Sequence, residues 1–261
     1  MADRGAIALP AIRAGHVASA YCQRDWRVHL RSPLAIGGML AGPLLLLLAI
    51  GIGLGSAIGG GAQHQILKVI VPGLVGMGVV LATSQRSIAV FSDRTSGLTD
   101  EIVAGPVTVR IIVLAQTLSS TTIATLQGLA VFALAAMLGL AVVPAHWLVF
   151  LIALVAFAFA CAATCNAMGL MARRPGSIQA LLNLVVNPLF FLSGALFDVS
   201  ATATPIRVIA LLNPFHYGVR LLQDAYNPGG LDLALVLQSA AVLIGVAIVA
   251  LLVSARSLRR R

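Results

Sequence analysis

Lysine and glutamate are almost missing from this sequence, with Lys68 and Glu101 as their only examples. A phosphate-binding loop needs a lysine followed by serine or threonine, whereas Lys68 is followed by Val69. A helical zinc-protease motif needs a glutamate directly after a histidine, whereas Glu101 follows Asp100. We therefore expect no nucleotide-hydrolysing site of this kind, no metal site, and no enzymatic activity of the chain itself.

Charge of either sign is also scarce, since 10% of the 261 residues are charged and 59% are hydrophobic. A soluble globular domain has roughly 25% charged residues, so a single water-soluble domain is excluded. The three cysteines are too few for a disulfide scaffold. The net charge of +9 would favour a nucleic-acid partner in a polar protein. In this apolar chain it marks membrane topology instead, and we expect no nucleic-acid partner.

Long charge-free intervals predict the membrane spans, because a spanning helix needs about 20 mostly apolar residues. The interval 111–172 is too long for one helix and breaks at Pro144, beside His146 and Trp147. We predict an all-α integral membrane protein with one transmembrane domain over 1–261. Its six transmembrane helices are expected at about 35–58, 67–91, 110–142, 147–171, 177–197 and 232–254.

The basic residues predict the orientation, because cytoplasmic loops carry an excess of arginine and lysine. With six spans, 14 of the 17 basic residues fall on the side of both termini. We therefore expect a cytoplasmic N-terminal region over 1–33 and a cytoplasmic tail over 255–261. The first apolar run begins after Pro33 and is too long for a secretory signal peptide, so we expect it to stay in the mature protein.

The segment before the first span has the pattern of an interfacial helix. Cys22, Trp26 and Leu30 recur four residues apart, and arginines fall on the opposite side. Such a helix lies in the membrane surface with its arginines toward anionic headgroups, so membrane lipids are an expected partner. A solvated basic tail is the alternative. The residues expected to contact the membrane are Arg24, Trp26, Arg27 and Arg31.

The connection over 92–109 gathers polar residues in an otherwise apolar chain. Asp93, Arg94, Asp100 and Glu101 lie within it, and Gly105-Pro106 closes it. Ile102 and Val103 follow the acidic pair, which predicts a short amphipathic helix that stops at Gly-Pro. A polar helix on the cytoplasmic side is a docking surface, and a solvated loop is the alternative.

The segment over 198–231 is expected on the outer side. Its apolar runs are too short to span, and Asn213-Pro214 divides it into two short helices, the second containing Tyr217. Gly194 and Asp198 precede these two helices, so we expect the fifth span to end early and the chain to re-enter in part. Ser193 and Gly194 are expected to belong to the outer gate. This segment is a candidate outer gate.

Uncharged polar residues within the spans are the candidates for a translocation path. Asn183 and Asn187 share a face of the fifth span, and Asn166 lies in the fourth. Hydrogen bonding between helices, without substrate contact, is the alternative for all three.

Four motifs follow one another along the chain. They are Ile70-Val-Pro-Gly-Leu-Val-Gly-Met77, Asp93-Arg-x-x-Gly97 with Asp100-Glu101 and Pro106, Asn187-Pro-Leu-Phe-Phe-Leu-Ser-Gly-Ala-Leu-Phe197 and Leu212-Asn-Pro-Phe-His-Tyr217. In this order they resemble the permease subunits of type 2 ABC exporters. The similarity is greatest to exporters of the daunorubicin-resistance type and extends to nodulation-factor and polysaccharide exporters.

This resemblance implies a permease that exports an amphiphilic drug, lipid or glycoconjugate from the bacterial cytoplasm, with antibiotic efflux as one form of that activity. ATP and Mg would bind to separate ABC ATPase subunits, and a second permease chain, identical or different, would complete the path. The stretch from Arg94 to Pro106 would be the coupling helix that docks on the ATPase. Here the chain departs from the family, with Gly97-Leu98-Thr99 where Gly-Thr-Leu is usual. The implied coupling residues are Arg94, Gly97, Asp100, Glu101 and Pro106.

Two interpretations from other classes stay open. An intramembrane serine protease would use Ser193 as nucleophile and His216 as base, which requires the two side chains in hydrogen-bond contact. A membrane assembly factor without transport activity is the other. Stimulation of a co-purifying ATPase distinguishes an exporter subunit from both.

The predicted topology is testable by cysteine labelling. A cysteine placed at Thr202 is expected to react with a membrane-impermeant maleimide added outside the cell, because 198–231 is predicted outside. A cysteine at Ser96 is expected to react only after the membrane is opened. The opposite labelling pattern would overturn the orientation.

Overall fold

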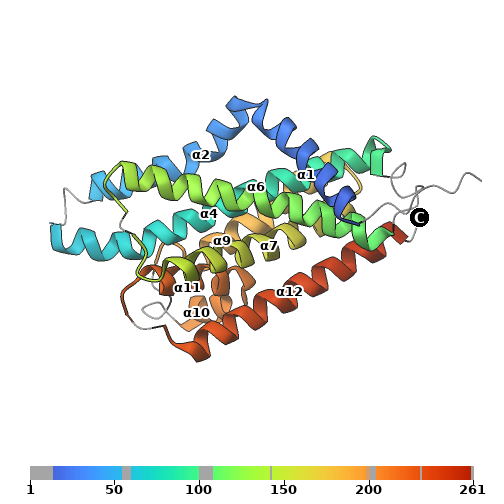
Figure 1. The fold of residues 1–261 in the computed structure, drawn as a ribbon. Helices are drawn as coiled ribbons and strands as arrows, with labels where there is room; N and C mark the ends of the chain where they lie inside the picture. Colours follow the sequence, from blue (N-terminus) through green and yellow to red (C-terminus); the bar gives the residue numbers. More distant parts are fainter. Residues whose placement is uncertain are drawn as a thin grey trace, which may run out of the picture.

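The computed structural model describes residues 14–54, 60–99, 108–141, 143–197, 199, 204–229 and 231–259. Within these ranges the regular elements are all helical (Figure 1). They are α1 (Ala14–Leu30), α2 (Pro33–Leu48), the π-helix η1 (Ala49–Leu54), α4 (Gly60–Thr95), α6 (Val109–Met137), α7 (Trp147–Met171), α8 (Pro175–Leu181), the π-helix η2 (Leu182–Val186), α9 (Asn187–Phe191), α10 (Thr204–Leu212), α11 (Pro214–Tyr226) and α12 (Leu233–Arg259).

Among the residues that the structure describes, four helices are long and apolar enough to cross a membrane: Ile66–Thr95, Val109–Met137, Trp147–Met171 and Leu233–Leu258. They correspond to the predicted second, third, fourth and sixth spans. The predicted first and fifth spans contain shorter apolar helices, Ile36–Leu48 and Gly176–Phe191. The all-helical fold is thus confirmed, while a total of six spans stays a prediction.

Two helix boundaries differ from the predicted ones for local reasons. α6 ends at Met137 and not near 142, because Gly139 adopts a left-handed conformation with φ of 71° that stops the helix. α4 continues past 91 to Thr95, so Arg94 lies on its last turn and not in a loop. The start of α7 at Trp147 agrees with the break predicted at Pro144.

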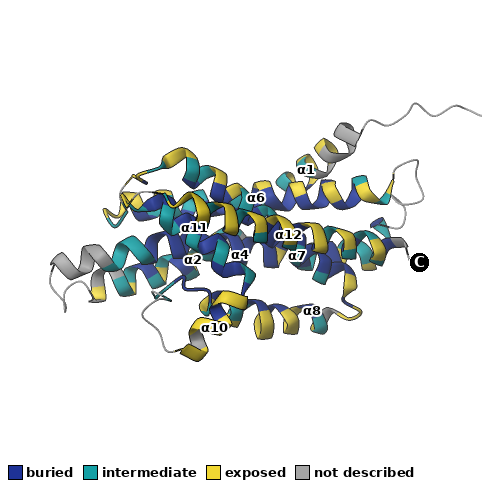
Figure 2. Cartoon of the chain, turned by 90° about the horizontal axis from the view of Figure 1, so that it is seen from below, coloured by how far each residue is buried: buried dark blue, intermediate teal, exposed yellow. Residues whose placement is uncertain are grey.

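The core lies where α4 packs between α6 and α7. Phe150, Phe157 and Leu154 of α7 and Leu74 of α4 are completely or almost completely buried, and Figure 2 shows this continuous buried centre. α12 packs on α7 but leaves large apolar side chains exposed, including Ile244 at 60% and Val249 at 61%. Apolar surface of this extent is stable against lipid, as expected of an outer helix of a membrane bundle.

The helices give the bundle two distinct ends. α4, α7 and α12 finish at the same end, where α1 also lies (Figure 1). We call it the arginine end, after Arg24, Arg86, Arg94, Arg173 and Arg256. At the opposite end, α11 packs against the beginnings of α4, α7 and α12. We call it the α11 end.

Glycines in the Pro-Gly motif of α4 allow other segments to approach closely. A Cβ atom on Gly73 would overlap the backbone carbonyl of Ala195, which follows α9. A Cβ on Gly76 would lie 3.4 Å from the ring of Phe157 on α7. The motif therefore positions the chain after α9 directly against α4.

Replacing Gly73 with alanine is expected to destabilise the fold by about 1–3 kcal/mol, because the added methyl group meets backbone and not a flexible side chain. Thermal unfolding of the purified protein measures the effect. Gly37→Ala in α2 is the matched control, since a Cβ at that position would have no neighbouring atom within 4 Å. Equal unfolding midpoints of the two variants would contradict the close approach.

Candidate functional site at the two ends of the bundle

Arg94 joins α4 to the end of α7. Its guanidinium donates to the backbone carbonyls of Leu170 and Ala172, the latter at 3.2 Å. The last carbonyls of a helix have no partner within that helix, and a cationic donor there also interacts favourably with the helix dipole. Arg94, predicted as an ATPase-coupling residue, thus holds two helix ends together.

Gly97 shapes the turn that follows α4. It has a φ of 83°, and its N–H donates to the carbonyl of Arg94 at 3.3 Å. A left-handed glycine just past a helix is a common stop signal. Thr99, two residues on, is completely buried. The other three predicted coupling residues, Asp100, Glu101 and Pro106, lie outside the described residues.

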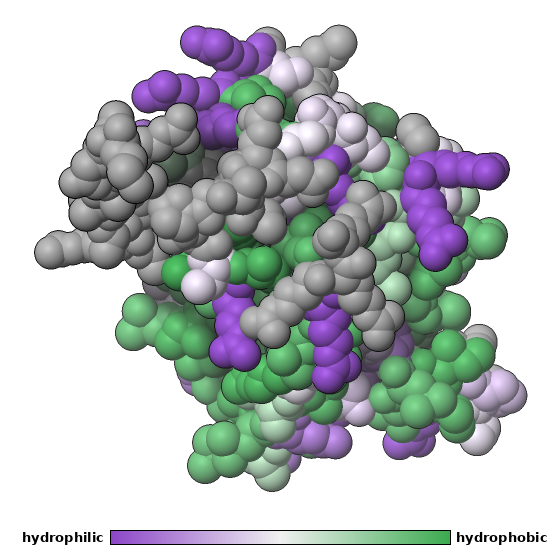
Figure 3. All heavy atoms as spheres, turned by 90° about the vertical axis from the view of Figure 1, so that its right-hand side faces the viewer, coloured by the Kyte–Doolittle hydropathy of each residue, from purple (hydrophilic) through white to green (hydrophobic). Residues whose placement is uncertain are grey.

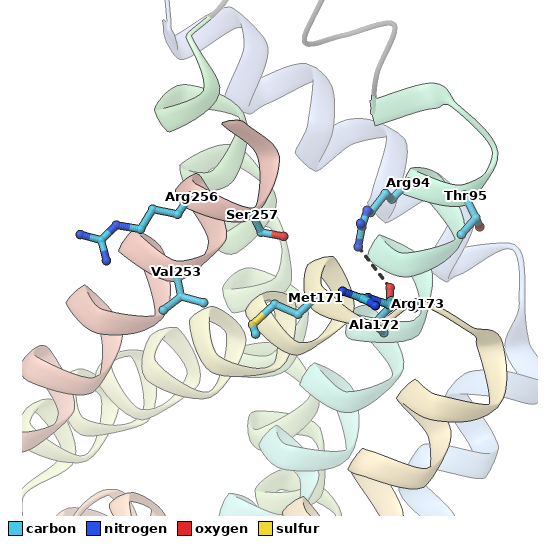
Figure 4. Close-up of a pocket in the computed structure, with 8 residues that line it drawn as sticks. All are labelled: Arg94, Thr95, Met171, Ala172, Arg173, Val253, Arg256 and Ser257. Carbon is cyan, nitrogen blue, oxygen red and sulfur yellow. Dashed lines mark hydrogen bonds between the residues drawn. The ribbon is translucent and has the colours of Figure 1, made fainter. Parts of the chain in front are cut away.

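A pocket of about 780 Å³ opens beside Arg94, between the ends of α4, α7 and α12. The Ser257 hydroxyl of α12 donates to the Leu170 carbonyl at 3.1 Å, so the same carbonyl meets α4 and α12. In Figure 4 Arg94 reaches toward Ala172, while Arg256 extends outward from α12. The pocket is lined by Arg94, Thr95, Met171, Ala172, Arg173, Val253, Arg256 and Ser257. Figure 3 views this end, where hydrophilic side chains project around apolar ones.

The segment predicted to be an interfacial helix contains the helix α1, which is joined to α4, and its position in the membrane surface stays a prediction. Arg24 donates to both carboxylate oxygens of Asp93, at 2.8 and 2.5 Å. Arg27 and Arg31 are exposed and Trp26 is half-buried. Arg24 therefore bonds within the protein, and the exposed arginines are the ones available to headgroups.

A buried ion pair also joins α1 to α4. Asp25 is 2% exposed and accepts from Arg86 of α4, which is 8% exposed. The Ser119 hydroxyl of α6 donates to the same carboxylate at 2.5 Å. Sequence reasoning missed this triad. The available signal was that Asp25 shares the helical face of Cys22 and Trp26, which faces the protein.

At the α11 end, two side chains of α11 hold the turn after α9. His216 Nδ1 lies 2.8 Å from the carbonyl oxygen of Ser193. Gln223 donates to the carbonyls of Gly194 at 3.0 Å and of Val69 at 3.3 Å. Gly194, with a φ of 88°, makes the turn. The predicted gate residues Ser193 and Gly194 thus contact α11 through His216 and Gln223, which were not predicted for this role.

Asn213 connects the remaining gate residues. Its side chain accepts from the N–H of Phe215 at 3.0 Å, which caps α11, and it donates to the Leu189 carbonyl of α9. Pro214 occupies the first turn of α11, where no N–H is required. The Tyr217 hydroxyl donates to Leu211 of α10 at 2.9 Å, on another side of the helix.

The geometry at Ser193 does not match a serine protease. The hydroxyl donates to the Phe190 carbonyl at 2.6 Å, and His216 meets the backbone of Ser193 and not its hydroxyl. Burial lowers the pKa of His216, although the bond to the Ser193 carbonyl opposes this shift. A nucleophile needs its base on the hydroxyl, so this pair serves to hold the turn.

The three candidate path residues divide between two places. Asn166 is 2% exposed and donates to the Ser120 hydroxyl of α6 at 3.2 Å, a bond between helices. Asn183 is exposed and accepts from Gln179 at 3.3 Å and from Asn187 at 3.4 Å. Asn183 and Asn187 therefore form a surface row of amides with Gln179, which sequence reasoning missed, and Asn166 is not part of it.

Comparison with protein families matches residues 17–226 to the family described as ABC-2 type transporter. This chain belongs to that family. The match begins within α1 and ends with α11, so it contains the Pro-Gly motif over 70–77 and the Asn-Pro motifs over 187–197 and 212–217. The resemblance found in the sequence is confirmed, and the chain is a membrane component of an ABC transporter.

Two proteins similar to this ABC-2 family member are both called Nodulation protein J. That of Rhizobium leguminosarum bv. viciae is 28% identical over 245 residues, which cover 92% of each chain. That of Sinorhizobium fredii (strain NBRC 101917 / NGR234) is 28% identical over 216 residues, covering 80% of this chain and 81% of its own. The similarity thus extends over most of the length of both proteins.

Replacing Asp25 with asparagine is expected to destabilise the protein by about 3–5 kcal/mol, because Arg86 keeps a buried charge without its partner. Thermal unfolding measures the loss, and proteolysis of α1 measures its release. Asp93→Asn, which breaks the more exposed pair with Arg24, is the matched control and should cost less than about 1 kcal/mol.

A double variant, Asp25→Asn with Arg86→Met, removes both charges. It is expected to recover much of the stability lost in Asp25→Asn, since no buried charge remains. A double variant as unstable as the single one would show that the ion pair is not the cause.

Proposed function

We propose that this chain is the membrane-spanning subunit of an ATP-driven exporter, whose ATP and Mg bind to separate ABC ATPase subunits. The observation that carries this proposal is the bonding around the turn after α4. Arg94 fixes the start of that turn to α7, and Arg24 of α1 fixes it through Asp93. The segment 100–107 leaves from this point, and a docking segment needs such a rigid base to pass a movement to the bundle.

The arginine end is proposed to face the bacterial cytoplasm, with both chain termini on that side. Its exposed Arg27, Arg31, Arg173 and Arg256 follow the positive-inside rule. The acidic pair Asp100-Glu101 would present the opposite charge to the ATPase. Coupling then rests on 100–107 for contact and on Arg94 and Gly97 for position.

The translocation path is proposed to lie between two permease chains, either two copies of this one or two different subunits. Asn183 and Asn187, with Gln179, expose hydrogen-bonding amides on the η2 segment. Amides without fixed charge suit an amphiphilic drug, lipid or glycoconjugate better than a small ion. The turn held by His216 and Gln223 would form the outer gate.

A second candidate is a membrane assembly factor that binds an ATPase without transport. It uses the same docking end, so docking alone does not separate the two. An exporter subunit requires faster ATP hydrolysis in its presence and cargo movement across the membrane.

Reversing the charge of the docking segment tests the proposal. Asp100→Lys with Glu101→Lys is expected to weaken co-purification of the partner ATPase at least about tenfold, because like charges across an interface cost several kcal/mol. Export should fall in parallel. Asp198→Lys with Asp232→Lys makes the same charge change on the predicted outer side and should leave both intact. Unchanged co-purification together with unchanged export would reject the docking role.

A further inference from the structure

Three hollows that share lining residues follow one another along α7 and α12 from the arginine end toward the α11 end. The arginine pocket shares Met171 and Val253 with a second hollow of about 510 Å³. That hollow shares Thr164, Met168 and Val246 with a third, of about 90 Å³, which reaches Phe157. We call the three together the α7–α12 groove.

The two parts of the groove differ in chemistry. Its mouth carries Arg94, Arg173 and Arg256 with the hydroxyl-bearing Thr95 and Ser257, and no carboxylate belongs to the described residues that line it. Below the mouth the walls are apolar, with valines, alanines and methionines and the open surface of Gly245. A cationic mouth above an apolar slot matches a molecule with an anionic head and a hydrocarbon tail.

The length of the groove fits one leaflet of a membrane. Along α7 it extends from Met171 to Phe157, which is about 21 Å at 1.5 Å per residue. Half of a hydrocarbon core is about 15 Å thick. The arginines therefore lie at headgroup level when the slot lies at the level of the acyl chains, and basic pockets between membrane helices bind anionic headgroups in this way.

We propose that the α7–α12 groove binds an anionic phospholipid of the leaflet at the arginine end. Its phosphate lies between Arg173 and Arg256, and an acyl chain lies along Gly245 and Val249. Arg94 stays on the α7 carbonyls and adds its charge to the mouth. The bound lipid bridges the ends of α7 and α12, where Ser257 already joins them. This inference stands whether or not the chain exports a cargo.

Lipid binding is tested on the purified full-length chain in detergent. Native mass spectrometry with added phosphatidylglycerol, phosphatidylcholine or glycerol 1-phosphate gives the affinity for each. We expect phosphatidylglycerol to bind at least about tenfold more tightly than either of the others. Equal binding of phosphatidylcholine would mean a nonspecific lipid shell, and equal binding of glycerol 1-phosphate a free-phosphate site. Either result would overturn the proposal.

Two variants test the mouth and the slot separately. Arg173→Gln with Arg256→Gln should weaken phosphatidylglycerol binding about 30-fold, since each basic residue near an anionic lipid contributes about fivefold. Arg94 is kept because it caps α7. Lys68→Gln with Arg207→Gln removes the same charge outside the groove and should change the affinity less than about twofold.

Gly245→Phe tests the slot, because no neighbouring atom lies within 4 Å of a Cβ at this position and the ring can fill the groove without a clash. It should reduce phosphatidylglycerol binding at least about tenfold. Ile248→Phe adds the same ring at an exposed position that does not line the groove, and it should bind as the parent does. If Gly245→Phe binds phosphatidylglycerol as tightly as the parent does, the acyl chain does not occupy the slot and the groove proposal is wrong.

Discussion

The carbonyl groups at the end of α7 have no partners in their own helix, and the arginine end is organised around their bonds. Leu170 accepts from Arg94 of α4 and from Ser257 of α12, and Ala172 accepts from Arg94. A buried carbonyl without a hydrogen bond costs about 1–3 kcal/mol, and Leu170 and Ala172 are both buried. These bonds therefore fix which three helices converge, and with them the position of the turn at Gly97 and of the pocket beside it.

At the α11 end, uncharged side chains bond to the backbone carbonyls that lack partners in a helix. Three uncharged side chains bond to the backbone of α9 and of the turn that follows it. They belong to Asn213, which caps α11, and to His216 and Gln223 of α11. Neutral side chains suit irregular backbone that is covered by protein. The two ends thus differ in the groups that join their helices: guanidinium groups at the arginine end, and amides and an imidazole at the α11 end.

Hydropathy and charge placement were sufficient to predict the four long helices. These helices lie where charge-free intervals required them, and α7 has the predicted bounds. The helix α1 and the division at Asn213-Pro214 also follow from local patterns. Each of these depends on residues close in sequence, which is why a periodicity or a breaker reveals it.

Contacts between distant residues were not predictable in this way. The Asp25–Arg86 pair joins residues 61 positions apart, and a single aspartate in a basic helix usually lies in water. Asn166 bonds to α6 while Asn183 and Asn187 bond to each other, and spacing along a helix does not say which neighbour each face meets. The role of Gly73 likewise depends on Ala195, which only the folded chain brings near.

The helix α7 is held by hydrogen bonds at both of its ends. At its start, the N–H groups of Ala145 and His146 donate to the carbonyls of Tyr226 and Ala225, the last residues of α11, at 3.2 and 3.0 Å. At its finish it is held by Arg94. Its 25 residues span about 37 Å and contain no proline or π-turn at which to bend. α7 therefore links the backbone at the end of α11 to the arginine end through a single uninterrupted helix.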